Sequence, residues 1–294
     1  MPSLKEIRIR IESVKSTMQI TSAMRLVSAS KLRKAQNVIL KLRPYNKKLN
    51  QILSHLKSSV GSDELGYLFT ERTPEKILII PVSSNRGLCG PFNANIIKQT
   101  VQLISDEYSL QHAKGNLELI TIGKKVTDFF TKRKYKVLSS HDHLLDKSDY
   151  NAISQLSDEI IRQFKGGKWD RILLIFNQFV NPAVQKVRVF QYLPVLEEVK
   201  SEVKTVEEIN YMFQPDKSEI LENLIPQSLK SRFYSVITES VASEHGARMT
   251  SMQKATDNAN ELTKELKLIY GKARQATITK ELIEIVTASE AAQA

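Results

Sequence analysis

The chain is poor in cysteine and in long apolar runs, and each scarcity excludes a class of protein. Its single cysteine, Cys89, excludes a disulfide within the chain and fits a reducing compartment. No apolar run approaches the roughly 20 residues that cross a bilayer, and the densest, from Ile77 to Val82, has the length of a strand. The start, MPSLKEIRIR, has neither the apolar core of a secretory signal nor an Arg/Ser-rich organellar leader. We therefore expect neither a membrane-inserted segment nor a cleaved leader.

Proline and glycine are scarce at both ends of the chain, which predicts two long helices. No proline lies between Ser3 and Arg43, and no glycine precedes Gly61. After Pro226, the last proline, only two glycines interrupt the sequence. At about 1.5 Å per residue, these helices would reach about 60 and 100 Å if unbroken. Because long helices must cover their apolar stripes, we expect the two to pair as an antiparallel coiled coil.

The net charge of +11 is concentrated at the start of the chain. Residues 1–50 contain twelve Lys and Arg against two acidic residues, which places +10 there and +1 in the rest of the chain. A basic helix of this kind fits an acidic protein surface or a nucleic acid. Because residues 1–44 contain no aromatic side chain, they lack stacking platforms for single strands. We favour an acidic protein partner and keep a basic coiled-coil nucleic-acid-binding protein as the alternative.

Apolar residues in both end segments recur with the three-and-four spacing of a coiled coil. In the first segment the spacing is regular to Met18, loosens over Ile20–Val27 and then resumes, and Pro44 is expected to mark a bend. In the last segment, His245 and Arg248 lie on the apolar stripe and indicate an interruption of the pairing. The predicted stripe consists of Val241, His245, Arg248, Met252, Ala255, Ala259, Leu262, Leu266, Ile269, Ala273 and Ala276.

Between these segments the pattern changes to short apolar runs separated by turns and helical stretches. Strands that alternate with helices predict a parallel sheet with crossover helices. The expected strands are 77–82, 117–122, 135–138, 171–176 and 187–192, with helices near 94–112, 124–133 and 149–164. We therefore predict four segments, which are an N-terminal shaft helix (1–60), an α/β domain (75–195), a return segment (196–226) and a C-terminal shaft helix (227–294).

The stretch that most resembles an enzyme motif is SSNRGLCGPFN, from Ser83 to Asn93, which follows the first expected strand. Its glycines match neither GxGxxG nor GxxxxGK[ST], so we interpret it as a tight turn that also forms a contact surface. A nucleotide-using α/β enzyme remains open as a further alternative. His141 and His143 could suggest a metal pair, but no cysteine lies nearby and a solvated loop is favoured. We expect no catalytic residue, cofactor or metal site.

Four longer strings resemble the gamma subunit of F-type ATP synthase in its bacterial form. They are LKEIRIRIESVKSTMQITSAMRLVSASKLRKAQ (Leu4–Gln36), SSNRGLCGPFN (Ser83–Asn93), SEHGARMTSMQKATDNA (Ser243–Ala259) and GKARQATITKELIEIV (Gly271–Val286). They cover both ends and the middle in the order that the family has, so the resemblance extends over effectively the whole chain. Asn85 and Pro91 stand where the family usually has an acidic residue and a glycine.

The resemblance implies a non-catalytic rotor shaft of a rotary ATP synthase. In that family the terminal helices form an antiparallel coiled coil, and a Rossmann-like α/β domain lies at its base. The implied partners are three alpha and three beta subunits, the epsilon subunit and the membrane c-ring. Proton-driven turning of the ring and the shaft would drive each catalytic beta site through its states in sequence, and ATP hydrolysis would reverse this. The implied location is peripheral, at the cytoplasmic face of the bacterial inner membrane.

The resemblance also implies two sets of partner contacts, when it is carried over residue by residue. The contacts with alpha and beta fall on Met24, Arg25, Arg248, Arg274, Gln275, Thr279 and Glu281. The contacts with epsilon and the c-ring fall on Arg86, Gly87, Cys89, Gly90 and Tyr211.

Overall fold

The computed structural model describes residues 3–57, 68–69, 72–147, 149–195 and 217–293. The chain divides into two compact units, each of which is considered by itself. Unit 1 contains Met1–Ala29 and Arg248–Ala294, and unit 2 contains Ser30–Ala247. Within the described ranges, no helix has both the length and the apolar character needed to cross a membrane.

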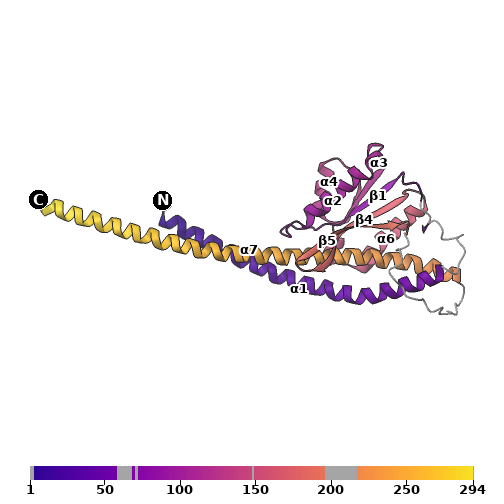
Figure 1. The fold of residues 1–294 in the computed structure, drawn as a ribbon, viewed down its shortest axis with the longest axis horizontal. Helices are drawn as coiled ribbons and strands as arrows, with labels where there is room; N and C mark the ends of the chain where they lie inside the picture. Colours follow the sequence, from indigo (N-terminus) through magenta and orange to yellow (C-terminus); the bar gives the residue numbers. More distant parts are fainter. Residues whose placement is uncertain (1–2, 58–67, 70–71, 148, 196–216, 294) are drawn as a thin grey trace. The chain divides into compact units, whose positions relative to one another are not determined.

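Figure 1 labels the helices and strands in chain order. They are α1 (Leu4–Lys57), β1 (Ile77–Pro81), α2 (Phe92–Asp106), α3 (Ser109–Ala113), β2 (Leu117–Thr121), α4 (Lys124–Lys132), β3 (Val137–Ser140), α5 (Leu144–Lys147), α6 (Tyr150–Lys165), β4 (Arg171–Asn181), β5 (Val184–Leu193) and α7 (Lys217–Gln293).

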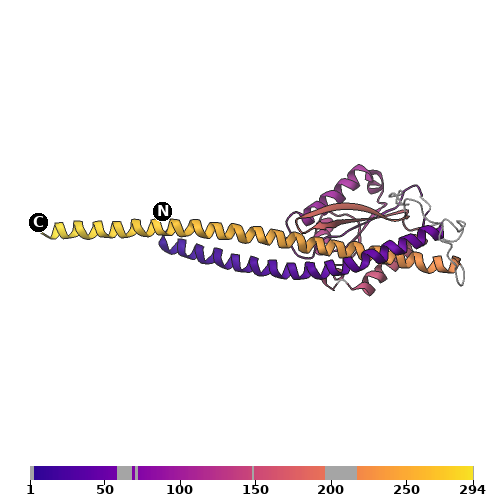
Figure 2. The same cartoon turned by 60° about the horizontal axis from the view of Figure 1, so that its bottom comes forward.

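In unit 1, the first half of α1 packs against the second half of α7 as an antiparallel pair (Figure 2). Ile7 of α1 lies in one buried cluster with Leu266 of α7. Further along α1, the hydroxyl of Thr21 lies 2.8 Å from that of Thr256, which is earlier in α7. Because the residue numbers of the contacting positions fall along α7 as they rise along α1, the helices run in opposite directions. The expected antiparallel coiled coil is confirmed.

The buried face of α1 keeps the three-and-four spacing through the region where loosening was expected. Thr21 and Ser28 continue it as buried residues, whereas Ile20 and Val27 are 61% and 58% exposed. The hydroxyl of Thr21 donates to the Met18 carbonyl at 3.0 Å, so a polar side chain is accommodated in the seam. The predicted loosening of the spacing over Ile20–Val27 was therefore wrong, because the residue type in the seam changes there and the spacing does not.

The buried face of α7 agrees with the predicted stripe at Met252, Ala259, Leu266 and Ala273 and is displaced by one residue at the alternate positions between them. Thr263 is buried next to the half-buried Leu262, whereas Ile269 is 48% exposed and Ala276 is also exposed. The face therefore passes through residues 252, 256, 259, 263, 266, 270 and 273. Threonine is again the residue type that the apolar pattern did not count.

Both prolines near the predicted helix ends lie inside helices. Pro44 is within α1 and Pro226 is within α7, so α1 continues without interruption and α7 begins at Lys217, before the expected start at 227. A proline in a helix removes one backbone donor and leaves the carbonyl four residues earlier without its partner. For Pro44 that residue is the exposed Leu40, whose carbonyl can bond to water. The division into four segments stays a prediction.

Unit 2 contains a five-stranded sheet in the order β3-β2-β1-β4-β5. The first four strands are parallel, and β5 is antiparallel to β4. The expected α/β domain with crossover helices is confirmed, with β3 two residues later than predicted and the 94–112 helix split into α2 and α3. β4 extends beyond its predicted end because it forms a hairpin with β5, in which the Asn181 side chain accepts the backbone N–H groups of Ala183 and Val184 at 3.0 and 2.8 Å.

The helices of unit 2 cover the sheet on both faces. β1, β2 and β3 follow one another toward one edge, so right-handed crossovers place α2 and α4 on one face, and the return to β4 places α6 on the other. Alternate strand residues such as Ile77 and Ile79 pack with Ile96 of α2 and Phe130 of α4 in the main core cluster. Together with the strand order, this layering is that of a Rossmann-like domain.

Candidate functional site

The predicted alpha and beta contacts at the end of α7 lie on an exposed helix. Arg274, Gln275, Thr279 and Glu281 are all exposed. The cluster that α7 shares with α1 extends along α7 only as far as Ala273. At about 100° per residue, Arg274 and Glu281 lie on one side of the helix and Gln275 and Thr279 on another. The structure thus presents them to solvent, as residues that contact a partner would have to be.

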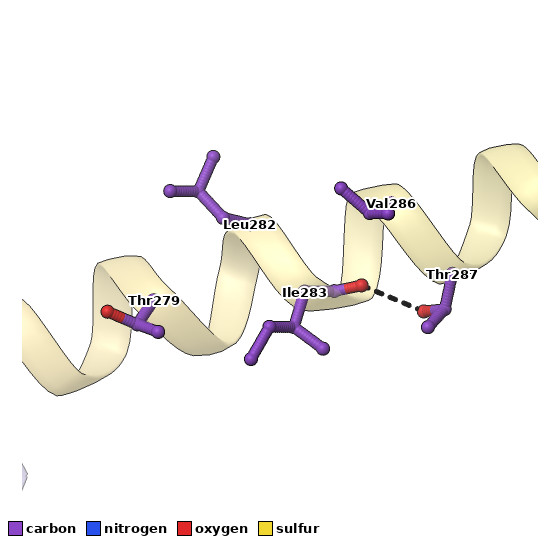
Figure 3. A pocket seen from close by; sticks show the side chains of 5 residues that line it. All are labelled: Thr279, Leu282, Ile283, Val286 and Thr287. Atoms are coloured by element: carbon purple, nitrogen blue, oxygen red, sulfur yellow. Dashed lines mark hydrogen bonds between the residues drawn. The ribbon is translucent and has the colours of Figure 1, made fainter.

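The same end of α7 exposes apolar side chains that sequence reasoning did not select. Figure 3 shows Leu282 and Val286 on one side of the helix and Ile283 on another, around a shallow pocket that Thr279 and Thr287 also line. The Thr287 hydroxyl donates to the Ile283 carbonyl at 2.9 Å. The signal that could have found these residues is an apolar pattern that continues after the partner helix has ended. Five such residues are 44% to 65% exposed, namely Ile278, Leu282, Ile283, Ile285 and Val286.

The remaining predicted alpha and beta contacts lie in the paired part of unit 1. Met24 and Arg25 are half-buried, and the exposed Leu26 follows them on α1. Arg248 is 7% exposed, so its guanidinium offers little surface within this chain. Unit 1 therefore contains all seven residues of this predicted set, and Arg248 is the one that the fold covers.

The loop of the second predicted set follows β1 and is held by its own polar side chains. The hydroxyl of Ser84 donates to the Arg86 carbonyl at 2.6 Å, and its backbone N–H donates to the Asn93 side chain at 3.0 Å. The Asn93 amide donates to the Cys89 sulfur at 3.2 Å. Leu88, in contrast, has a left-handed φ of 62° and an exposed side chain. The loop is the tight turn that the sequence predicted, and it points an apolar residue outward.

The predicted residues of this loop differ in what they can offer to a partner. Arg86 and Gly90 are exposed and Gly87 is half-buried, whereas the Cys89 side chain is buried. A contact with epsilon or the c-ring at this loop would therefore use the residues around Cys89 and not its thiol. Tyr211 lies outside the described residues.

The place where a Rossmann-like sheet usually binds a ligand is filled by protein. That place is the crevice at the carboxyl ends of β1 and β4, where the strand order reverses. Phe92 and Cys89, which follow β1, form a buried cluster with Ala247 of α7. Asn177 of β4 donates its side-chain amide to the Phe92 carbonyl at 3.2 Å. The occupied crevice argues against the nucleotide-using enzyme.

The two histidines in the loop after β3 form a polar cluster. The rings of His141 and His143 lie 5.9 Å apart, and the Ser139 hydroxyl is 3.0 Å from Nε2 of His141. Burial, reinforced by the neighbouring His143, lowers the pKa of His141. Over the described part of the chain, no three His, Cys, Asp or Glu side chains gather as a metal site would require.

Comparison with known proteins gives a consistent result over nearly the whole chain. The family model described as ATP synthase matches residues 3–292. The ATP synthase gamma chains of Cytophaga hutchinsonii and Flavobacterium johnsoniae are 46% and 47% identical over 292 and 291 residues, and each alignment covers 99% of both chains. Because these relatives are named gamma chains, the nucleic-acid alternative gains no support from them.

Solved structures show a similar fold. A chain of the Euglena gracilis mitochondrial ATP synthase, determined as OSCP/F1/c-ring, has a TM-score of 0.65 at 19% identity and covers 98% of this chain and 94% of that one. A chain of the Tetrahymena thermophila mitochondrial ATP synthase central stalk and c-ring has a TM-score of 0.59 at 19% identity, and the match covers 80% and 99% of the two chains. At this identity the likeness concerns the fold.

Proposed function

The chain belongs to the ATP synthase family, as a gamma chain, and from that premise we propose that it is the central rotor shaft of an F-type ATP synthase. The shaft couples proton-driven rotation of the c-ring to sequential changes in the catalytic beta subunits, and works in reverse on ATP hydrolysis. The observation that carries this proposal is the long antiparallel helix pair, from which α7 continues as an exposed helix with apolar side chains. Such an end needs a partner that covers it.

The two units would serve different partners. Unit 1, with Met24, Arg25 and the exposed end of α7, would contact the alpha and beta subunits, three of each. The loop of unit 2 around Arg86 and Leu88 would contact epsilon and the c-ring. Contacts with alpha and beta must form and break as the shaft turns, and exposed ion pairs suit this because each contributes only about 0–1 kcal/mol.

We place the chain at the cytoplasmic face of the bacterial inner membrane, as a peripheral subunit. The support comes from the bacterial relatives and from the exposed surfaces that fit protein partners. Membrane vesicles should retain the chain through repeated washing and release it together with alpha and beta when the complex is stripped off without detergent. Release that requires detergent would contradict a peripheral location.

Reconstitution with the alpha, beta and epsilon subunits of the same organism tests the function. We expect the chain to assemble into one complex with three alpha and three beta subunits and to raise ATP hydrolysis above that of alpha and beta alone. On stripped membranes, the complex should pump protons when ATP is added. Failure to assemble, or hydrolysis and pumping that do not depend on the chain, would refute the proposal.

A further inference from the structure

The part of α7 that fills the crevice of unit 2 consists of small residues. Ser243 and Ala247 lie one turn apart on α7, with Gly246 between them, and both side chains are buried. Small side chains allow a helix backbone to approach a sheet closely, because no Cβ branch holds the two apart. The crevice therefore receives the body of the helix.

Three separate contacts hold this turn of α7. The Ser243 hydroxyl donates to the Asn177 carbonyl of β4 at 2.8 Å. Ala247 packs with Cys89 and Phe92, which follow β1. The turn is therefore attached to β4 by a hydrogen bond, and by apolar packing to the loop that follows β1 and to the first residue of α2.

The third contact is made at Gly246, where the β4–β5 hairpin reaches the helix. A Cβ atom on Gly246 would lie 3.2 Å from the Cα of Pro182, 3.3 Å from its carbonyl oxygen and 3.5 Å from the Phe179 ring. Two of these neighbours are backbone atoms, so a side chain could be accommodated only if the hairpin or the helix moved. Gly271, the other glycine of α7, has nothing within 4 Å of such a Cβ atom.

We propose that residues 243–247 of α7 are the junction through which torque passes between the sheet of unit 2 and the C-terminal helix. The inference rests on the proposed function as a shaft and names the residues that make the attachment. A helix that transmits rotation must not slip on the body that turns it, and contacts from β4, from the loop after β1 and from the β4–β5 hairpin all resist slipping. Gly246 acts as a positioning residue, because its missing side chain sets the distance between hairpin and helix.

Gly246→Val is the direct test, and Gly271→Val is its matched control. Both variants place the same β-branched residue in the same helix, so both have the same intrinsic cost to helix formation. Only Gly246→Val should displace the hairpin. In the reconstituted complex on stripped membranes, we expect Gly246→Val to lower the protons pumped per ATP hydrolysed several-fold, while Gly271→Val stays close to the wild type. Equal pumping ratios in the two variants would overturn the junction.

A disulfide cross-link tests the junction independently, so the proposal can still be tested if the Gly246→Val variant fails to fold. Cys89 is the only cysteine of the chain, so Ala247→Cys creates a single possible disulfide within the chain, between two positions of one buried cluster. If the junction stays closed during turnover, the oxidised complex should form the disulfide and pump as well as the reduced one. Loss of pumping on oxidation, restored by reduction, would overturn the proposal, and so would failure of the disulfide to form.

The two proposals fail in different ways in these experiments. A wild-type complex that neither assembles nor couples would refute the shaft itself. A wild-type complex that couples, together with a Gly246→Val complex that couples equally well, would refute only the junction.

Discussion

At the scale of single residues, polar side chains in the helix seam are the least expected feature of unit 1. The hydroxyls of Thr21 and Thr256 lie 2.8 Å apart, and each also lies within hydrogen-bonding distance of a carbonyl of its own helix. Replacing one threonine by valine leaves the other hydroxyl with one partner fewer, whereas replacing both leaves a matched apolar pair. We expect Thr21→Val and Thr256→Val each to lower the free energy of unfolding by about 1 kcal/mol, and the double variant to cost less than their sum.

Urea unfolding followed by circular dichroism measures this double-mutant cycle. Thr17→Val, at an exposed position on the same helix, is the control and should change the free energy of unfolding little. Strictly additive effects of the two seam replacements would show that the hydroxyl pair does not couple the helices.

A half-buried glutamate, Glu239, gives the second prediction at this scale. Burial raises the pKa of the Glu239 carboxyl above 4.5, and the positive charges of Arg43 and Arg188 only partly oppose this. The folded chain therefore holds this proton more tightly than the unfolded chain, so ionisation costs stability as the pH rises from about 4.5 through the raised pKa. We expect Glu239→Gln to be more stable than the wild type at pH 8 and to lose this advantage near pH 4.

Thermal unfolding at a series of pH values checks the sign of that difference. Glu265→Gln, at an exposed glutamate of the same helix, should follow the wild type throughout. A Glu239→Gln variant that is less stable than the wild type at pH 8 would mean that the two arginines outweigh the cost of burial.

The residue scale also shows what the sequence could and could not predict. Leu266, which packs against Ile7 and Ile11, was predicted from spacing alone, because apolar side chains in a seam are buried for the same reason wherever they occur. Thr21 and Thr263 were missed because a hydroxyl is satisfied by the carbonyl one turn earlier, and no apolar pattern records that possibility. Counting threonine and serine as permitted seam residues would have recovered the continuous spacing.

At the scale of elements, the stability of the helix pair in unit 1 should depend on a few buried side chains. Leu266 of α7 packs against Ile7 and Ile11 of α1, whereas Leu268, two residues later, is 69% exposed. Truncating a buried leucine removes its transfer free energy and leaves a cavity, so Leu266→Ala should cost about 2–5 kcal/mol. Leu268→Ala is the matched control and should stay within about 0.5 kcal/mol of the wild type. Urea unfolding of the full chain measures both, and similar losses would contradict the observed seam.

Elements also differ in how far local sequence determines them. β1 and β2 were predicted to within one residue, because buried strands are short continuous apolar runs, whereas the partly exposed β3 was predicted two residues too early. The length of β4 was not predicted, since residues 177–181 are ordered by pairing with β5, which is a contact that the run itself does not contain. The filling of the crevice by Ser243 and Ala247 depends on residues far apart in sequence and could not have been inferred from either segment alone.

At the scale of the whole molecule, the uneven distribution of charge should govern how fast the chain meets its partners. Residues 1–50 carry +10 of the net +11, and Lys5, Arg10 and Lys15 are exposed on α1. Charge of one sign on a binding surface raises the rate of association with a partner of opposite charge at low ionic strength, and salt screens this effect. We expect replacement of these three residues by glutamine to flatten the salt dependence of association with the alpha and beta subunits, and to leave the thermal stability of the isolated chain unchanged because exposed charges contribute little to it.

Stopped-flow mixing with alpha and beta subunits at increasing ionic strength provides the measurement, and a second triple variant provides the control. Lys114, Lys125 and Lys132 are exposed on unit 2, so their replacement by glutamine removes the same charge from a surface that is not proposed to meet alpha or beta. If net charge alone directs the encounter, the two triple variants should flatten the salt dependence equally. If the basic helix directs it, only the α1 variant should do so, because screening confines the attraction to charges within about 10 Å of the acidic partner at 0.1 M salt.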